Sequence, residues 1–308
     1  MFTFLLNRQC LHPKYWLLAA FLVLVWCFTR LPFRAQWACA PSLGRFLYRV
    51  SSKIRHVTES NLRACFPEMD ALQAEVMLRN SAEELGYSII ETFIIWFCNI
   101  DRYLVGQFDV EGAEHMQAAL NSGRGVIVLA CHYGSVDTNG ALLAQVGLGG
   151  KEFVGTFRQT DGAINEFLAA VRGKFCDRLV SAGDQRTMVK ALRTRNVVWY
   201  APDIEVRNKS SAFVEFMGVQ ASTTLAPARL AKAGNAVVLP FVHYRDPGSK
   251  RYKVKVLAPL DDFPSGDLVA DARTVNAVFE RMLAPFPERY WWVIKRFKNR
   301  PPEAPSIY

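Results

Sequence analysis

The chain has 308 residues, 51% of them hydrophobic, so it can bury a sizeable core and is too apolar to be intrinsically disordered. Its seven cysteines are scattered without a Cys-x-x-Cys pair, which argues against a disulfide framework or a zinc site and suits a reducing compartment. The formal net charge is +9, and eight basic side chains lie in the first 55 residues, where they flank a very hydrophobic segment. This arrangement favours an anionic membrane surface over nucleic acid as the partner of these basic residues.

That hydrophobic segment, KYWLLAAFLVLVWCFTR, carries no charge over residues 15–29 and would form a helix about 22 Å long. A bilayer core is about 30 Å thick, so the segment spans it only if residues 31–33 extend the helix. A cleaved signal peptide is the alternative. We expect a membrane anchor over residues 1–34, with the chain that follows in the cytoplasm, because more basic residues follow the segment than precede it.

Residues 35–104 are expected to form a helical, membrane-proximal region. Within residues 41–55, apolar side chains recur among basic ones with the spacing of one helical face. This pattern is typical both of a helix lying on a membrane and of an ordinary surface helix. A second helical pattern covers residues 70–100, and its apolar part, SIIETFIIWF, suits either a buried helix or one that contacts the membrane.

From about residue 105, short β-rich runs alternate with helical stretches. This alternation predicts a layered α/β domain over residues 105–308, with a mixed, largely parallel sheet. The run RYKVKVL alternates strictly and predicts a half-exposed edge strand. The predicted strands cover residues 125–130, 153–157, 197–200, 236–244 and 252–257. The predicted helices lie near residues 138–147, 162–175, 185–195, 225–233 and 270–284.

The main candidate site follows the first of these strands, where GVIVLA leads into CHYGSVD. Ligands of open α/β sheets bind beyond the carboxyl ends of the strands, which is where His132 falls. Asp137 lies near the first turn of the next helix and could accept a hydrogen bond from the imidazole, which would leave the other ring nitrogen as a general base. A structural role for this pair is an equally good interpretation. Ser135 is nearby, but no Gly-x-Ser-x-Gly elbow surrounds it.

Charged side chains also follow other predicted strands. Arg158 comes just after the second strand, Arg172 lies on the helix after it, and Asp203 follows the third strand in the sequence Pro-Asp. Each alone suits a surface or salt-bridge residue. Together they place guanidinium and carboxylate groups near a candidate base, where arginine could bind a phosphate or stabilise the oxyanion of acyl transfer. No second ligand cluster accompanies His132, so a metal site is not expected.

The last 22 residues, PERYWWVIKRFKNRPPEAPSIY, combine aromatic and basic side chains. A segment docked on the core with a solvated basic rim explains this composition. Contact with a lipid phosphate or with an acidic protein explains it equally well.

Several segments occur in one order along nearly the whole chain: LHPKYWL, NLRACFPEM, HYGSVD, VVWYAPD, PARLA, PERYWW and KRFKNRP. Together they resemble the secondary acyltransferases of lipid A biosynthesis, of the lauroyl/myristoyl type, within the lysophospholipid acyltransferase superfamily. In this family a histidine and an acidic residue separated by four positions form the catalytic dyad, so the resemblance assigns these roles to His132 and Asp137. It also carries over Arg172 and Asp203 as substrate-binding residues, beside Arg158.

The resemblance implies transfer of a fatty acyl group from the thioester of acyl carrier protein to a hydroxyl of a Kdo-bearing lipid A precursor. His132 would take the hydroxyl proton while Asp137 stabilises the imidazolium, with no cofactor and no metal. The expected partners are acyl carrier protein, the lipid A precursor and membrane lipid, at the cytoplasmic face of the cell inner membrane. A lysophospholipid, an aminolipid or another envelope glycolipid is the alternative acceptor. A non-catalytic, lipid-binding membrane-surface protein is the alternative from another class.

Overall fold

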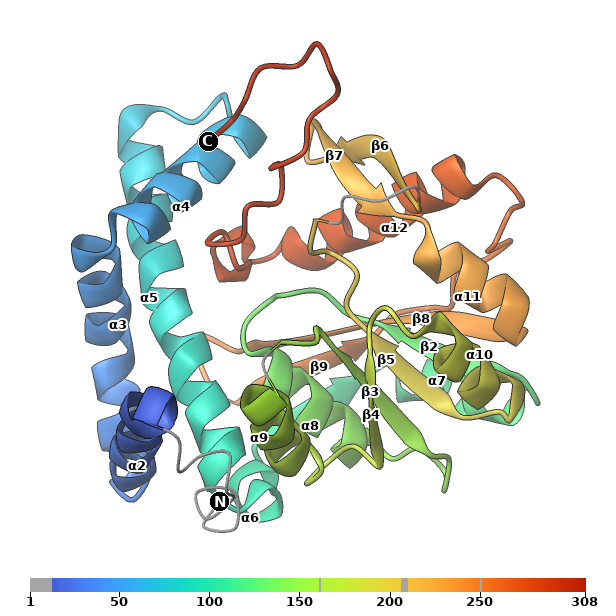
Figure 1. The fold of residues 1–308 in the computed structure, drawn as a ribbon, viewed down its shortest axis with the longest axis horizontal. Helices are drawn as coiled ribbons and strands as arrows, with labels where there is room; N and C mark the ends of the chain where they lie inside the picture. Colours follow the sequence, from blue (N-terminus) through green and yellow to red (C-terminus); the bar gives the residue numbers. More distant parts are fainter. Residues whose placement is uncertain (1–12, 161, 206–209, 250) are drawn as a thin grey trace.

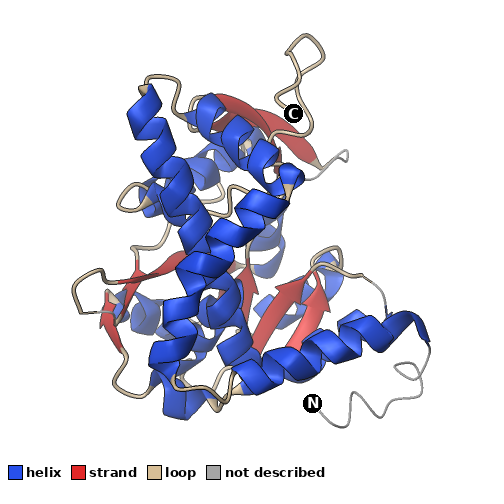
Figure 2. Cartoon of the chain, turned by 90° about the vertical axis from the view of Figure 1, so that its left-hand side faces the viewer, coloured by secondary structure: helices blue, strands red, loops and turns tan. Residues whose placement is uncertain are grey.

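The computed structural model describes residues 13–160, 162–205, 210–249 and 251–308 (Figure 1). A group of helices forms one side of the molecule, and an α/β body forms the other. The helices of this group are η1 (Pro13–Tyr15), α2 (Trp16–Phe28), α3 (Phe33–Val50), α4 (Ser52–Cys65), α5 (Ala71–Phe97) and α6 (Ile100–Leu104). Figure 2 views the molecule from this side, with α3 and α5 crossing in front of the sheet.

The α/β body is built on a seven-stranded sheet in the order β1-β9-β8-β2-β5-β3-β4. Strands β8, β2, β5, β3 and β4 are parallel, whereas β9 runs antiparallel to β8 and pairs in parallel with β1. The sheet is therefore mixed and largely parallel, as the sequence predicted. Its strands are β1 (Phe108–Glu111), β2 (Gly125–Leu129), β3 (Phe153–Phe157), β4 (Arg178–Ser181), β5 (Val197–Tyr200), β8 (Ala236–Arg245) and β9 (Tyr252–Val256).

Both faces of this sheet are covered, as parallel strands require. Successive side chains of β2 point to opposite faces: Val126 and Val128 join a core cluster with α5, α7 and α8, while Ile127 and Leu129 join one with α10, α11 and α12. The helices of the body are α7 (Ala113–Asn121), α8 (Val136–Val146), α9 (Gly162–Arg172), α10 (Gln185–Arg193), α11 (Ala226–Gly234), α12 (Leu268–Leu283) and the short η2 (Pro287–Arg289). The result is a three-layer sandwich that holds the carboxyl ends of β2, β5 and β3 at one edge.

Two features of the body differ from the prediction. The alternating strand β9 is half-exposed as expected, but it is not an edge strand, because β1 pairs along its other side. Alternation reports how many faces of a strand are buried and says nothing about its neighbours. The second feature is a separate two-stranded hairpin, β6 (Ser211–Phe216) with β7 (Val219–Thr224), which the sequence did not reveal.

The helical pattern predicted over residues 41–55 is divided between two helices: its apolar residues lie on α3, and the chain breaks between α3 and α4 at Ser51. The Ser51 hydroxyl accepts a hydrogen bond from the backbone N–H of Ile54 at 3.3 Å and so caps the start of α4. Helix α3 also packs closely on α5, since a Cβ atom at Gly44 would stand 1.9 Å from the Ala82 carbonyl oxygen. One face of α3 is thus covered by protein.

The predicted membrane-anchor helix is not supported. Its first part, residues 1–12, lies outside the described residues, and the described part, α2, has 13 residues and a length of about 20 Å. In the ranges that the structure describes, no helix combines the length and the apolarity needed to cross a membrane. The division of the chain at residues 34 and 104 stays a prediction.

The segment after η2 docks on the core, which was one of the two interpretations of its composition. Trp292, Arg296 and Phe297 are buried. Asn61 of α4 donates hydrogen bonds to the carbonyl oxygens of Trp292 at 2.6 Å and Ile294 at 2.8 Å, so this segment joins the helical side of the molecule to the sheet.

Candidate functional site

The centre of the candidate site is His132, which lies three residues beyond the end of β2. Asp203 lies three residues beyond the end of β5, and β2 and β5 are paired neighbours in the sheet. The two residues therefore meet at the carboxyl edge. The Nδ1 atom of His132 is 2.7 Å from Oδ1 of Asp203, and the backbone N–H of His132 donates to Oδ2 of the same carboxylate at 2.8 Å.

This double contact orients the imidazole. An ionised carboxylate can only accept hydrogen bonds, so Nδ1 of His132 is the donor in this contact and Nε2 is the nitrogen left for proton transfer. Burial alone would raise the pKa of Asp203, but the charge and hydrogen bonds of His132, with help from Arg296, lower it below its usual value. The carboxylate thus stays ionised beside an imidazole whose side chain is 15% exposed. Such a pair can accept a proton at Nε2 and stabilise the imidazolium that results.

Asp137 has a different partner from the one predicted. It lies in the first turn of α8, and its carboxylate accepts hydrogen bonds from Nε of Arg172 at 2.7 Å and from Nη2 at 3.2 Å. Burial would lower the pKa of Arg172, but the charge and hydrogen bonds of Asp137 outweigh it and raise that pKa. The predicted hydrogen bond from the His132 imidazole to the Asp137 carboxylate is therefore wrong. Sequence proximity suggested it, whereas the fold pairs each group with a residue from another strand or helix.

Arg158 lies just past the end of β3 and is exposed. The structure thus brings four of the predicted residues into two partly buried pairs, His132 with Asp203 and Asp137 with Arg172, and leaves Arg158 at the surface. In the part of the chain that the structure describes, no three His, Cys, Asp or Glu side chains are grouped in a way that could hold a metal ion.

The loop that carries His132 is held by the segment after η2, which sequence reasoning did not connect with the site. The backbone N–H of Trp291 donates to the His132 carbonyl at 2.9 Å, and the N–H of Gly134 donates to the Arg289 carbonyl at 2.9 Å. Tyr133 and Tyr290 form the antiparallel bridge between them. Gly134 has a φ of +63°, a conformation that glycine adopts without strain. The backbone of the His132 loop is thereby tied down on both sides of the imidazole.

Ser135 serves as a helix cap. Its hydroxyl accepts a hydrogen bond from the backbone N–H of Thr138 at 3.1 Å, at the start of α8, and lies 2.9 Å from the hydroxyl of Thr92 on α5. Ser135 is fully buried. These contacts explain the serine without a nucleophilic role.

A second histidine, His243, is buried beside the loop that carries His132. Nδ1 of His243 on β8 is 3.1 Å from Nδ2 of Asn139, whose Oδ1 accepts from the Trp199 indole at 2.9 Å. Burial, with Arg289 and Arg245 adding to it, lowers the pKa of His243 to about 3. This imidazole is neutral and cannot act as a base for a substrate. A histidine within the otherwise apolar strand segment LPFVHY was the signal that could have identified it.

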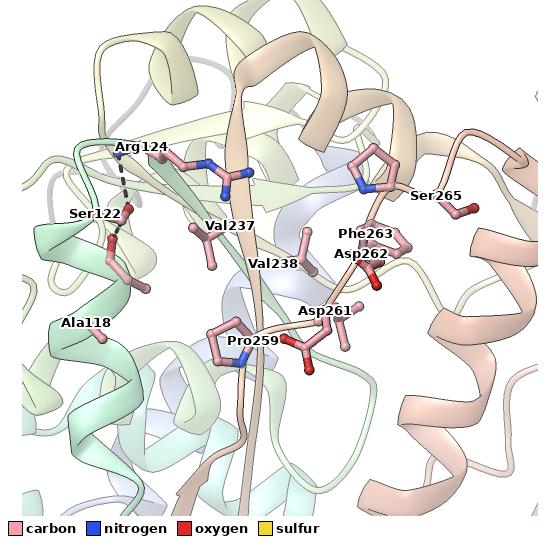
Figure 3. Close-up of a pocket in the computed structure, with 13 residues that line it drawn as sticks. Ala118, Ser122, Arg124, Val237, Val238, Pro259, Asp261, Asp262, Phe263 and Ser265 are labelled. Carbon is pink, nitrogen blue, oxygen red and sulfur yellow. Dashed lines mark hydrogen bonds between the residues drawn. The ribbon is translucent and has the colours of Figure 1, made fainter.

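A cavity elsewhere in the molecule does not belong to this site. It has a volume of ≈ 780 Å³ and lies at the opposite edge of the sheet, between the start of β8 and the loop of residues 259–265 (Figure 3). Arg124, Asp261 and Asp262 line it, and it includes none of the five predicted site residues. The chemistry at the carboxyl edge, rather than cavity size, identifies the candidate site.

Comparison with known proteins identifies relatives along nearly the whole chain. The family model described as bacterial lipid A biosynthesis acyltransferase matches residues 6–299. The chain is 31% identical to the lipid A biosynthesis lauroyltransferase of Escherichia coli (strain K12), with 98% of each chain covered. It is 27% identical to the lipid A biosynthesis palmitoleoyltransferase of the same organism, covering 98% of this chain and 97% of the relative. It is 28% identical to a lipid A biosynthesis acyltransferase of Haemophilus influenzae, covering 97% and 96%.

Proposed function

The chain belongs to the family of bacterial lipid A biosynthesis acyltransferases, and from this premise we propose that it moves a fatty acyl group from the thioester of acyl carrier protein to a hydroxyl of a Kdo-bearing lipid A precursor. The family predicted from the sequence is confirmed by these matches. The donor, the acceptor and the residue roles given below are parts of the proposal.

His132 acts as the general base in the proposed reaction. Its Nε2 atom takes the proton of the acceptor hydroxyl as the oxygen attacks the thioester carbonyl. The new C–O bond forms, the C–S bond breaks, and the imidazolium returns its proton to the leaving thiolate. The observation that carries this proposal is the 2.7 Å contact between Nδ1 of His132 and Asp203, because it leaves Nε2 as the acceptor and stabilises the protonated ring.

Asp137 and Arg172 hold the start of α8 and the end of α9 together beside the His132 loop. In this proposal Asp137 supports the base by positioning, while Asp203 supplies the charge that stabilises the imidazolium. Two of the five N–H groups of Arg172 are used by Asp137, so the others can still bind a phosphate or a sugar acid of the acceptor. The exposed guanidinium of Arg158 is suited to the same anionic groups.

The proposed location is the cytoplasmic face of the cell inner membrane. Both the lipid acceptor and the acylated product are amphiphiles, and the helical side of the molecule exposes apolar side chains of α2, including Leu17 and Leu24. Basic residues flank that helix in the sequence. These features support a membrane surface as the place where a carrier-bound acyl group meets a lipid hydroxyl.

The test is an assay of the purified full chain with acylated acyl carrier protein and the Kdo-bearing precursor. We expect His132→Gln to lower kcat by about 10²- to 10⁴-fold, the usual contribution of a general base, with an unchanged thermal midpoint. Equal activity of the variant and the wild type would exclude the catalytic role. Parallel assays with a lysophospholipid acceptor identify the alternative substrate class, since faster transfer to it than to the precursor would overturn the proposed acceptor.

A further inference from the structure

A second cavity lies where the start of α3, helix α6 and the start of β9 meet. Its volume is ≈ 580 Å³. It is lined by Phe33, Arg34, Trp37, Arg102, Tyr103, Gln107 and Tyr252. None of these residues belongs to the two charged pairs of the candidate catalytic site, and the inference drawn from this cavity does not depend on the acyl-transfer reaction.

The walls of the cavity are aromatic, neutral and held in place. The rings of Phe33 and Tyr103 have their centroids 5.0 Å apart, and the hydroxyls of Tyr103 and Tyr252 are 2.8 Å apart. Burial raises the pKa of both tyrosines, so their hydroxyls stay protonated. The Arg245 guanidinium lies 5.1 Å from the centre of the Trp37 ring and fixes that side chain from behind. These walls offer apolar surface and hydroxyl groups but no negative charge.

Two arginines from different elements stand at the mouth of the cavity. Arg34 is in the first turn of α3, and Arg102 is in α6; both are exposed, and within the described residues neither guanidinium forms a hydrogen bond or an ion pair. The acidic neighbour of Arg102, Asp101, accepts a hydrogen bond from Gln145 at 2.8 Å. Both guanidinium groups therefore lie beside an aromatic wall without an ion-pair partner among the described residues. Guanidinium groups bind phosphate oxygens in pairs of parallel hydrogen bonds.

Exposed apolar side chains continue from the cavity along the chain. Phe33, which lines it, is 44% exposed, Leu31 just before it is 47% exposed, and Leu17 and Leu24 on α2 are 87% and 69% exposed. Helices α2 and α6 lie at the same end of the α3–α5 pair (Figure 1). A ligand that carries a phosphate next to hydrocarbon would meet the arginines and this apolar surface together. A water-soluble phosphate compound would use only the arginines.

We propose that this cavity binds the phosphate-diester headgroup of an anionic membrane phospholipid. Arg34 and Arg102 clamp the phosphate, Tyr103 and Trp37 form the wall against the headgroup, and Phe33 and Leu31 enter the hydrocarbon beside it. The site holds the enzyme on the membrane in one orientation, separately from any lipid substrate at His132. The proposal assigns a function to two basic residues that the catalytic site does not use.

The test compares binding of the purified full chain to vesicles of phosphatidylcholine alone and to vesicles that also contain phosphatidylglycerol. Because each basic residue near a membrane surface contributes about 1 kcal/mol, we expect the double variant Arg34→Gln/Arg102→Gln to weaken binding to the anionic vesicles by about 30-fold. Binding to the neutral vesicles should stay unchanged. The acyl-transfer rate in detergent should also stay unchanged, since neither arginine lies in the catalytic site.

The matched control is Arg49→Gln/Lys53→Gln, which removes the same charge from exposed positions of α3 and α4 outside the cavity. We expect a much smaller effect, because neither side chain lines the cavity that would hold a headgroup. Equal weakening by the two double variants would mean that only diffuse charge attracts the membrane, and would overturn the proposal. Displacement of the chain from the vesicles by excess inorganic phosphate would also overturn it, since the site would then bind free phosphate rather than a lipid headgroup.

Discussion

At the scale of single residues, the structure gives two carboxylates other partners than the sequence suggested. The sequence placed Asp137 beside His132 because only four residues separate them, yet the carboxylate that contacts the imidazole is Asp203, 71 residues away in the chain. Asp137 meets Arg172 instead, across 35 residues. Under the proposed mechanism, substitution of each carboxylate distinguishes a charge that acts on the base from one that positions a helix.

Asp203→Asn should lower kcat with little change in stability. The amide can still accept the hydrogen bond from the His132 backbone N–H, but it no longer carries the charge that stabilises the imidazolium. Since general-base catalysis contributes about 10²- to 10⁴-fold, the loss in kcat should fall in that range. Kinetics and thermal unfolding of the same preparations provide the measurement. A variant that transfers acyl groups at the wild-type rate would remove Asp203 from the mechanism.

The matched variant Asp137→Asn should lose stability as well as activity. It leaves the buried Arg172 guanidinium without its counter-charge, and breaking one side of a buried ion pair typically costs about 3–5 kcal/mol. Denaturant unfolding of both carboxylate variants distinguishes the two roles. If Asp203→Asn were the less stable of the two, the assignment of charge and positioning would have to be reversed.

The neutral imidazole of His243 predicts a pH dependence of stability. Its pKa is about 3 in the folded chain, whereas an unfolded histidine titrates near 6.5. Between these values the unfolded chain binds a proton that the folded chain does not, so acidification favours unfolding. The free energy of unfolding should fall by up to about 1.4 kcal/mol per pH unit below pH 6.5 from this group alone.

His243→Gln removes this titration while keeping a polar side chain opposite Asn139. Urea unfolding of the wild type and the variant between neutral pH and pH 5 gives the comparison, because all other titrating groups contribute to both curves. We expect the wild type to lose stability more steeply on acidification. Parallel curves would show that the folded chain takes up the proton without cost.

At the scale of helices and strands, the sequence predicted the elements whose pattern is local. All five predicted strands exist, and β3 and β5 have the predicted bounds, because a run of β-branched and aromatic residues between turns is itself the signal. Strands β1 and β4 have only four residues each, and their burial does not alternate clearly, so nothing local distinguishes them from loops. The pairing of β9 with β1 joins residues more than 140 positions apart, which no local pattern contains.

The contact between α3 and α5 depends on two glycines. A Cβ atom at Gly86 would stand 2.0 Å from the Ala40 carbonyl oxygen, so the helices would have to separate to accept it. Gly86→Ala should therefore destabilise the chain by about 1–3 kcal/mol through overpacking, although alanine is the better helix former by about 1 kcal/mol. Asn80→Ala, at an exposed position of the same helix, is the control and should be neutral or stabilising. Thermal unfolding of the two variants provides the comparison; a stabilised Gly86→Ala chain would contradict the close packing.

At the scale of the whole molecule, distant parts of the chain meet behind the candidate site. The Tyr308 hydroxyl donates to Oδ1 of Asn61 at 2.5 Å across 247 residues and accepts from the Phe297 N–H at 3.0 Å. Asn61 in turn donates to the carbonyls of Trp292 and Ile294, next to the Trp291 N–H that binds the His132 carbonyl. No local pattern in the sequence shows that the segments NLRACFPEM and PERYWW meet, because their contact exists only in the folded chain.

Asn61→Ala should therefore lower the acyl-transfer rate, although Asn61 is not part of the candidate catalytic site. It leaves two carbonyl groups and the Tyr308 hydroxyl without their partner in a buried place, which costs about 1–3 kcal/mol for an unsatisfied group. The strand-like contact that fixes the His132 loop then loosens. We expect kcat to fall at least about tenfold, because misplacement of a reacting group by about 1 Å can lower the rate by about 10²-fold. The KM for the acyl donor should change little. Tyr308→Phe removes a single hydroxyl and should give a smaller change in the same direction. Steady-state kinetics at a temperature well below both unfolding midpoints separates positioning from unfolding. Variants that lose stability but keep the wild-type kcat would show that this contact holds the fold together without placing the base.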